Sequence, residues 1–342
     1  DIANMGFAEA ADIPVILVAD INRGGVIASL IGTYEVLSHA ERVRVKGFII
    51  NKFRGDKSLF DDGIKIIGTH TNWPCLGVIP HFNNAHLLPQ EDAMALDEAV
   101  KKPPIGAIKI AVPHLPRIAN FDDLDPLINE PDVTVEMIRA GTPLPGNADL
   151  VLIPGSKSTS ADLAYFRAQG WDIDLRAHHR RGGRILGLCG GYQMLGKDIR
   201  DPHGIESKQP SIEGLGLLDI STEMQSEKTV ALTHATYLPT GDRVAGYEIH
   251  IGQTHGPDCE RAWLDIAGRP EGAMSADGRI RGCYLHGLFA ADAFRAAFLK
   301  DFDAVSSIRY DQQVDQVLNT LALQLEQQLD LDQILSLARK VV

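Results

Sequence analysis

The sequence lacks the features that would place it in a membrane or outside the cell. It has no run of about 18 apolar residues, which a membrane-spanning helix needs, and its first residues do not form a secretory signal peptide. Its cysteines have no C-x-x-C spacing, so neither a zinc site nor a disulfide framework is indicated. The four are Cys75, Cys189, Cys259 and Cys283. We therefore expect a cytoplasmic protein with reduced thiols.

Positive charge is also scarce. The chain has 33 lysines and arginines against 45 aspartates and glutamates, which gives a formal net charge of −12. This balance argues against nucleic acids and anionic membranes as partners. A small anionic substrate needs only a local site and is not excluded. The hydrophobic content of 44% and charged content of 23% are typical of a globular protein.

The length predicts two domains. A single core stops growing at about 250 to 300 residues, and this chain has 342. Paired prolines at 103–104, within Lys-Lys-Pro-Pro, indicate a linker because they end regular structure. We place the domains at 1–100 and 101–342.

The first domain shows apolar strand-like runs that alternate with helix-like segments, which predicts a parallel α/β sheet. The strand-like runs are residues 14–20, 45–51 and 75–80, with helix-like spacing at 24–38 and 59–70. The first two runs end in Asp20 and Asn51. Both side chains should therefore lie at the carboxyl edge of the sheet.

The second domain begins with the same α/β pattern and then changes. Its expected parallel strands are residues 106–112, 149–153 and 185–189. From residue 211 onward, short segments with frequent glycines predict antiparallel strands and hairpins. Residues 312–340 have apolar positions near helical spacing, and we expect closing amphipathic helices. We favour packing on their own, second domain over the alternative of a partner-binding role.

A cysteine lies where an apolar strand meets a pair of glycines. Residues 185–195 read Ile-Leu-Gly-Leu-Cys-Gly-Gly-Tyr-Gln-Met-Leu, which predicts a strand, a tight turn at Cys189 and a helix. Such a turn lifts a nucleophile out of the backbone. The amide of Gly190 would then face the oxyanion of a tetrahedral intermediate, and the helix N-terminus would favour a thiolate. The alternative is a small buried core cysteine.

A cysteine nucleophile needs a base, and two histidines are candidates. His286 ends an apolar strand within Gly-Cys-Tyr-Leu-His-Gly-Leu-Phe, a position that could face a thiol on a neighbouring strand. A structural histidine is the alternative there. His250 lies in Gly-Tyr-Glu-Ile-His-Ile-Gly, where strand alternation puts it on the same face as Glu248. It is the second candidate base, and a pair that contacts the substrate explains it equally well.

The turn at 154–159, Pro-Gly-Ser-Lys-Ser-Thr, is not a phosphate-binding loop, because no glycine lies at the upstream spacing that the motif requires. We expect the amide of Gly155 or Ser156 to serve as a second oxyanion donor instead.

Taken together, these segments resemble a class I (triad-type) glutamine amidotransferase, and more closely the cobyric acid synthase family. That family joins a dethiobiotin-synthetase-like, P-loop-type ATP-binding domain to an amidotransferase α/β domain. The matching segments are residues 1–32, 46–56, 115–127, 154–159, 185–195, 246–252 and 284–289. The resemblance implies that residues 1–100 are the C-terminal part of the ATP-binding domain and that 101–342 form the amidotransferase domain.

The resemblance also implies roles for single residues. Cys189 would be the nucleophile and His286 its base, while Gln193 would help to hold the substrate glutamine. Asn51 falls where related domains contact adenine, and Asp20 could assist Mg²⁺. No metal site is expected within the chain itself.

The implied reaction is the ATP-dependent amidation of corrin-ring carboxylates in cobalamin biosynthesis, from adenosylcobyrinic acid a,c-diamide to adenosylcobyric acid. Ammonia would come from glutamine, so the expected partners are glutamine and a corrinoid. ATP and Mg²⁺ are expected for the full reaction, to activate the carboxylate as an acyl phosphate, with no tightly bound cofactor.

Two departures from the family pattern qualify the expectation. Class I enzymes usually carry a glutamate two residues after the histidine, where this chain has Leu288. The group that orients His286 is therefore unassigned. The family's Walker A loop is also absent from the sequence, and we expect a chain that hydrolyses glutamine but does not bind ATP properly by itself.

Three other interpretations compete with this one. Cobyrinic acid a,c-diamide synthase is a close relative of the family, but the segments at 120–127 and 155–159 favour the cobyric branch. The amidotransferase subunit that modifies a cell-wall lipid precursor has a similar thiol turn, and residues 1–100 argue against it. A binding module with an inactive thiol is the non-enzymatic alternative.

Overall fold

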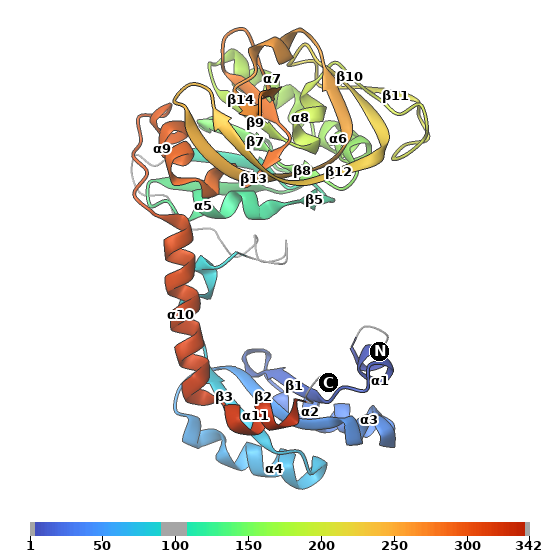
Figure 1. Cartoon of the computed structure of the whole chain (residues 1–342), viewed down its shortest axis with the longest axis vertical. Coiled ribbons are helices and arrows are strands. Elements are labelled where there is room, and N and C mark those ends of the chain that lie inside the picture. The colour runs from blue at the N-terminus through green and yellow to red at the C-terminus, as the bar shows by residue number, and fades with distance from the viewer. Residues whose placement is uncertain (1–3, 90–107, 339–342) are drawn as a thin grey trace. The chain divides into compact units, whose positions relative to one another are not determined.

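A computed structural model describes residues 4–89 and 108–338 (Figure 1). The chain divides into two compact units. Unit 1 combines Asp1–Leu88 with Val314–Val342, and unit 2 is Pro89–Gln313. The expected boundary at 100/101 and its two prolines lie outside the described residues.

Unit 1 is built on a parallel sheet in the order β1-β2-β3, as the apolar runs predicted. Its strands are β1 (Val15–Asp20), β2 (Val45–Phe53) and β3 (Cys75–Pro80), and its helices before residue 89 are α1 (Met5–Ala10), α2 (Val26–Val36), α3 (His39–Arg44) and α4 (Asp61–Thr71). Phe48 and Ile50 of β2 pack with Leu30 of α2 and Ile67 of α4 in one core cluster. Helices α2 and α4 thus bury one face of the sheet.

The C-terminal helices cover another part of unit 1, and the expectation that they pack on the second domain is wrong. Helix α10 (Tyr310–Gln328) continues from unit 2 into unit 1 and is followed by α11 (Leu331–Leu337). Leu325 and Leu329 pack against a cluster that contains Leu76 and Ile79. The Asp330 amide donates to the Leu76 carbonyl at 2.9 Å. An apolar stripe reveals that a helix has a buried face, but it does not reveal which sheet that face covers.

Unit 2 contains a six-stranded sheet in the order β16-β17-β9-β7-β4-β6. Its strands are β4 (Ile108–Pro113), β6 (Val133–Ile138), β7 (Leu150–Ile153), β9 (Arg184–Leu188), β16 (Ala273–Met274) and β17 (Ile280–Cys283). All neighbouring pairs are parallel except β16 with β17. The expected strands of the α/β part are therefore confirmed.

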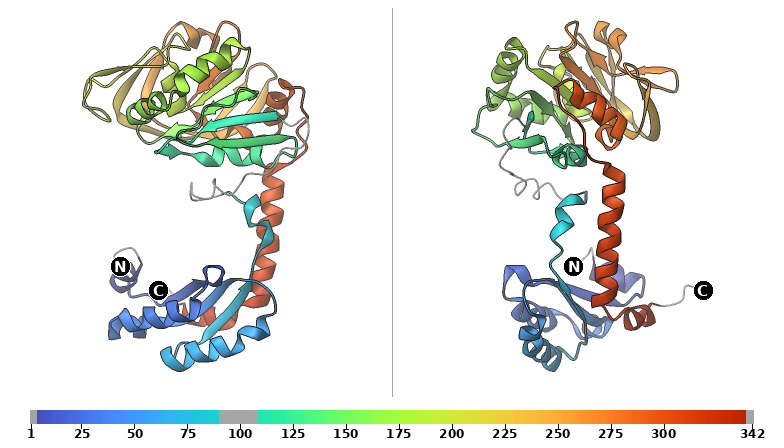
Figure 2. Two further views of the ribbon diagram at one scale, coloured as in Figure 1. Left: turned by 180° about the vertical axis from the view of Figure 1, so that it is seen from behind. Right: turned by 90° about the vertical axis from the view of Figure 1, so that its left-hand side faces the viewer.

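Two layers cover this sheet. On one face, Phe166 of α6 (Thr159–Ala168) and Trp171 of α7 (Trp171–Arg180) share a core cluster with Val151 of β7. On the other face, Leu152 packs with Phe294 of α9 (Asp292–Lys300). Figure 2 shows α6 and α7, in green, lying against the six-stranded sheet. The site therefore stands on a rigid, doubly covered scaffold.

The second sheet of unit 2 is mostly antiparallel, as the glycine-rich segments predicted. Its members are β10 (Asp198–Arg200), β11 (Ser211–Glu213), β12 (Ser221–Tyr237), β13 (Asp242–His255), β14 (Leu264–Ile266), β15 (Arg269–Glu271) and β18 (Leu285–His286). The long β12–β13 hairpin dominates it, and β18 pairs with β13 so that His286 lies opposite Tyr247. Among the described residues, no helix is long and apolar enough to cross a membrane.

The carboxyl ends of four parallel strands carry the chemistry-bearing residues of unit 2. Cys189 follows β9, and the short strand β8 (Gly155–Ser156) follows β7. His286 follows β17, and the 3₁₀ helix η5 (Phe121–Leu124) follows β4. Parallel strands bring their carboxyl ends to one edge, which is where α/β proteins bind ligands.

Candidate active site

Cys189 occupies a strained turn between β9 and the helix α8 (Gly190–Leu195). Its φ of +50° and ψ of −108° are a conformation that non-glycine residues rarely adopt. The turn is held on both sides, since the Cys189 amide donates to the Cys283 carbonyl at 2.9 Å and the Gln193 amide donates to the Cys189 carbonyl at 3.1 Å. The predicted strand–turn–helix is confirmed. Strain of this kind is typical of a turn that presents a nucleophile.

The two glycines after the thiol allow the turn to approach the segment that follows β7. A Cβ added to Gly191 would collide with the Ile153 carbonyl oxygen, and one added to Gly190 would lie 2.9 Å from the Ser156 amide nitrogen. Only glycine permits this packing. Both predicted oxyanion donors are thereby brought next to each other.

His286 is completely buried and is oriented by an aspartate that the sequence did not reveal. The His286 Nδ1 atom lies 2.7 Å from the Asp123 Oδ2 atom, and the Gly287 amide donates to Asp123 Oδ1, also at 2.7 Å. Asp123 comes from η5, 163 residues earlier in the chain. It takes the part of the glutamate that position 288 lacks, where Leu288 packs in the core instead. The only sequence signal was its place in the family-like segment 115–127.

The surroundings of His286 keep its imidazole protonated. Burial alone would lower the pKa of His286. The hydrogen bond to Asp123 and the nearby Cys189 sulfur have the larger, opposite effect, so that the pKa is raised to about 10. Tyr247 stacks on the ring with a centroid distance of 5.1 Å. The buried Nε2 atom has no hydrogen-bond partner within residues 4–89 and 108–338. This nitrogen can therefore exchange a proton with the sulfur or with a substrate.

Cys189 opens into a cavity of about 330 Å³. It is lined by Ala119, Asn120, Ser156, Lys157, Thr159, Cys189, Gly190, Gln193, Glu206, Lys228, Ile249, His250 and Ile251. The Cys189 Sγ atom lies 3.5 Å from the Ile249 carbonyl oxygen. Of the two residues predicted as the second oxyanion donor, Ser156 lines the cavity and Gly155 does not. A Cβ added to Gly155 would lie 3.5 Å from the His286 ring. The geometry favours Ser156.

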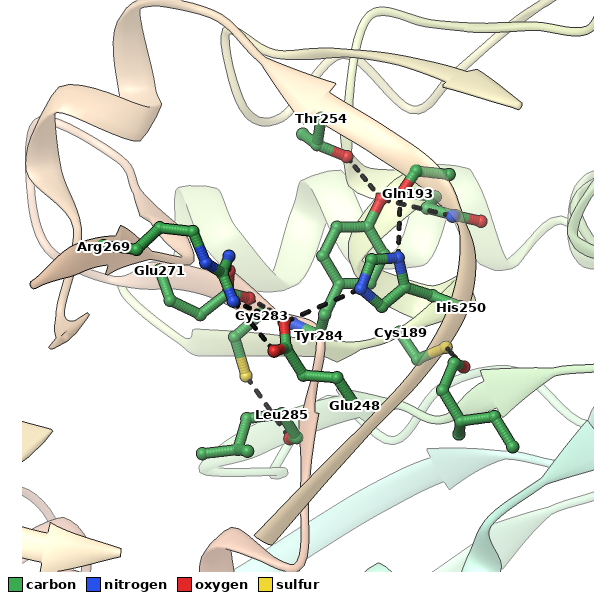
Figure 3. Close-up of polar contacts among 12 residues, drawn as sticks. Cys189, Gln193, Glu248, His250, Thr254, Arg269, Glu271, Cys283, Tyr284 and Leu285 are labelled. Atoms are coloured by element: carbon green, nitrogen blue, oxygen red, sulfur yellow. Dashed lines mark hydrogen bonds and ion pairs between the residues drawn. The ribbon is translucent and has the colours of Figure 1, made fainter. Parts of the chain in front are cut away.

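Gln193 lies in the wall of this cavity, but the protein already engages both ends of its amide. Its Oε1 atom accepts from the Thr159 hydroxyl at 2.8 Å, and its Nε2 atom donates to the Tyr284 hydroxyl at 3.2 Å. Figure 3 shows Gln193, Tyr284 and Thr254 joined in one hydrogen-bonded chain. The residue therefore borders the cavity and fixes the wall around it, and its part in holding glutamine stays a prediction.

His250, the second candidate base, lines the cavity but has other partners. Its ring stacks on Tyr284 at a centroid distance of 3.9 Å, and its Nδ1 atom lies 2.8 Å from the Gly252 carbonyl oxygen. Its Nε2 atom lies 3.6 Å from Glu248, which in turn forms an ion pair with Arg269 at 2.8 Å (Figure 3). His286, with its buried free nitrogen, is the better base for Cys189.

The predicted nucleotide residues meet at the carboxyl edge of the unit 1 sheet. Asp20 and Asn51 are paired across β1 and β2. Lys52, which the sequence analysis did not single out, links them, because its Nζ lies 2.8 Å from Asp20 and its amide donates to the Asn51 side chain at 2.8 Å. The hydrogen bond from Lys52 is the main reason that the pKa of Asp20 lies below its usual value.

The described part of the chain holds no cluster of three or more His, Cys, Asp or Glu side chains that could bind a metal ion. Mg²⁺ is commonly bound by one or two carboxylates together with substrate phosphates. A single carboxylate at Asp20 fits that pattern.

Comparisons with known proteins agree with this geometry. The family model for a CobB/CobQ-like glutamine amidotransferase domain matches residues 109–294, and the model for an AAA domain matches residues 1–86. The cobyric acid synthase of Ruegeria sp. (strain TM1040) is 58% identical over 341 residues, which are 100% of this chain and 70% of that protein. Those of Cereibacter sphaeroides (strain ATCC 17023) and Rhizobium johnstonii are 53% and 56% identical, over 99% and 96% of this chain and 70% and 68% of those proteins.

The α/β scaffold with its strained cysteine turn and buried histidine–aspartate pair defines a glutamine amidotransferase of the CobB/CobQ-like type. The sequence identities of 53% to 58% with cobyric acid synthases, over nearly the whole chain, identify the family within this class. The chain belongs to the cobyric acid synthase family, and it is an enzyme.

Proposed function

We propose that Cys189, His286 and Asp123 hydrolyse glutamine and that the ammonia released amidates carboxylates of a corrinoid, in the reaction of cobyric acid synthase. The observation that carries this proposal is the His286–Asp123 pair of 2.7 Å beside the strained Cys189 turn. The alternative of an inactive thiol leaves both the strain and the raised pKa of His286 without a purpose.

The first half of the hydrolysis forms a thioester. The Cys189 thiolate attacks the side-chain amide carbon of glutamine, and the amides of Gly190 and Ser156 hold the developing oxyanion. The His286 imidazolium gives its proton to the departing nitrogen, so the carbon–nitrogen bond breaks and ammonia leaves. Asp123 keeps the imidazole oriented and balances its charge.

The second half releases glutamate. His286, now neutral, takes a proton from a water molecule that attacks the thioester carbon. The carbon–sulfur bond then breaks, and the product leaves as glutamate, with a carboxylic acid where glutamine had its side-chain amide. The thiolate–imidazolium pair is thereby restored. Each group therefore ends the cycle in the state in which it began.

The ammonia serves the synthetase reaction. A corrin carboxylate is a poor electrophile, so ATP first converts it to an acyl phosphate, and ammonia then displaces phosphate to form the amide. We propose Asn51 as an adenine contact and Asp20 as a carboxylate that assists Mg²⁺. Glu248 and His250 are candidates for contacts near the substrate. The cytoplasm, where reduced thiols persist, is the compartment that fits this chemistry.

Glutamate release from glutamine tests the proposal. The wild-type chain should release glutamate, and Cys189→Ala should reduce the rate to background. A Cys283→Ala variant is the matched control, because Cys283 is a buried thiol outside the cavity lining. A release rate that is unaffected by Cys189→Ala would refute the assignment of the nucleophile.

A further inference from the structure

The cavity at Cys189 carries an unusual set of charges. Among the residues that line it, Glu206 supplies a carboxylate, and Lys157 and Lys228 supply two ammonium groups. None of the three forms an ion pair with another residue of the described ranges 4–89 and 108–338. The cavity therefore offers an anion and cations that are not paired with each other. A free amino acid has the complementary charges, an α-ammonium group for the anion and an α-carboxylate group for the cations.

The loop that carries Glu206 is held in place by a buried aspartate. The Asp201 carboxylate accepts from the backbone amides of Ile205, Glu206 and Ser207, each at 2.8 Å. Asp201 is only 3% exposed. Three charge-assisted hydrogen bonds to consecutive amides fix the backbone of the loop, so Glu206 is presented by a preorganised segment.

The Glu206 side chain is itself positioned. Its Oε2 atom accepts from the Thr159 amide at 2.9 Å, at the start of α6. Thr159 also donates from its hydroxyl to Gln193, one helical turn beyond Cys189. The carboxylate is therefore connected by two hydrogen bonds to the turn that carries the thiol.

The charge on Glu206 is incompletely compensated. Burial raises the pKa of this carboxyl, and the hydrogen bonds from Thr159 and Ser160 offset that effect only in part. A half-buried carboxylate without a cationic partner gains from a cationic ligand that enters the cavity. Ammonium groups are such ligands.

We propose that Glu206 binds the α-ammonium group of the substrate glutamine, with Lys157 and Lys228 facing its α-carboxylate. The proposal rests on the proposed glutaminase function, and it adds the residues that make the site select a free amino acid. A glutamine residue inside a peptide, whose amino and carboxyl groups are amides, would lose both contacts. The competing explanation is that Glu206 only caps the N-terminus of α6.

The substitution Glu206→Gln separates the two explanations, because an amide oxygen can still accept from the Thr159 amide while the charge is lost. Amide hydrolysis should be measured with glutamine and with glutaramate, the analogue without the amino group. For Glu206→Gln we expect kcat/KM for glutamine to fall about 10- to 100-fold, the range of a charged hydrogen bond, and kcat/KM for glutaramate to stay within about 2-fold. Equal losses for both substrates, or none for glutamine, would overturn the proposal.

Covalent labelling of Cys189 provides a readout that does not require turnover. The glutamine-shaped diazoketone 6-diazo-5-oxo-L-norleucine should label Cys189 more slowly in Glu206→Gln by the same factor, whereas chloroacetamide should label both proteins equally. Glu213→Gln, an exposed carboxylate of β11, is the matched control and should behave as wild type. Equal diazoketone labelling of Glu206→Gln and wild type would overturn the proposal. If chloroacetamide labels Cys189 of the wild type and the diazoketone does not, the glutaminase function itself fails.

Discussion

At the scale of single residues, three side chains from distant parts of the chain make one chemical unit. Cys189 is held in a strained turn beside a cavity, and His286 carries a proton that the buried Asp123 stabilises. In the proposed mechanism, this proton is the one that the departing ammonia takes. Asp123 is the positioning residue on which this state depends.

Substitution Asp123→Asn should therefore reduce glutaminase kcat by about 10²- to 10⁴-fold, the range that general acid–base catalysis contributes, with little change in KM. The alkaline limb of the kcat profile should move to lower pH, because the pKa of His286 loses its main raising contribution. Steady-state kinetics across pH would measure both effects. Asp122→Asn is the comparison, because Asp122 accepts a hydrogen bond from the Tyr247 hydroxyl and none from the imidazole. The fold reduction in kcat should be at least about tenfold smaller in this variant than in Asp123→Asn. Equal losses in the two variants would contradict the role of Asp123.

Local sequence patterns predicted Cys189 and His286 of the site but not Asp123 and Glu206. The Gly-Gly pair after an apolar strand predicted the Cys189 turn, and a strand that ends in histidine predicted His286, because both signals lie within a few residues. Asp123 and Glu206 gave no such signal. The parts that we propose for them depend on contacts across 163 and 47 residues, which tertiary packing creates and periodicity does not encode.

At the scale of elements, the docking of the C-terminal helices on unit 1 depends on a close backbone approach. Gly77 of β3 has a φ of +154° and forms an isolated bridge with Leu329. A Cβ at this position would collide with the Gln328 carbonyl oxygen. The sequence predicted the strand and the helices but not their contact, because glycine in a strand has several explanations.

Substitution Gly77→Val should destabilise this docking. We expect a loss of about 1 to 3 kcal/mol in the free energy of unfolding of unit 1, as for other overpacked sites. Urea unfolding followed by the fluorescence of Trp73, which lies in unit 1, would measure it, with the tryptophans of unit 2 replaced by phenylalanine in every protein compared. Gly32→Val has open space around its added Cβ and is the control for the side chain itself. An unfolding midpoint no lower for Gly77→Val than for Gly32→Val would contradict this account of the docking.

At the scale of the whole molecule, the proposed catalytic residues and the proposed nucleotide contacts belong to different compact units. Cys189, His286 and Asp123 lie in unit 2, whereas Asp20, Asn51 and Lys52 lie in unit 1. In unit 2, the buried His286 is a group whose folded-state pKa lies far above its ordinary value of 6.5 and within a pH range that unfolding experiments can cover. Its protonation therefore links the stability of this unit to pH.

The sign of that linkage follows from the direction of the shift. Because folding raises the pKa of His286 to about 10, its stabilising contribution is complete below about pH 6.5 and is lost as pH rises to 10. The difference in unfolding free energy between wild type and His286→Gln should accordingly shrink by a few kcal/mol across this window. Chemical unfolding at several pH values would measure the difference. A difference that is constant or grows with pH would show that His286 is neutral in the folded protein.

The central claim is that the Cys189 sulfur attacks glutamine. Its most direct test is mass spectrometry of the intact chain and of its proteolytic peptides, after the chain is mixed with glutamine and quenched in acid within milliseconds. We predict a covalent glutamyl adduct, heavier than the free chain by one glutamine minus one ammonia, on the peptide that contains Cys189 and absent from Cys189→Ala. An adduct on another residue, or glutamate release that continues in Cys189→Ala without any adduct, would contradict the account.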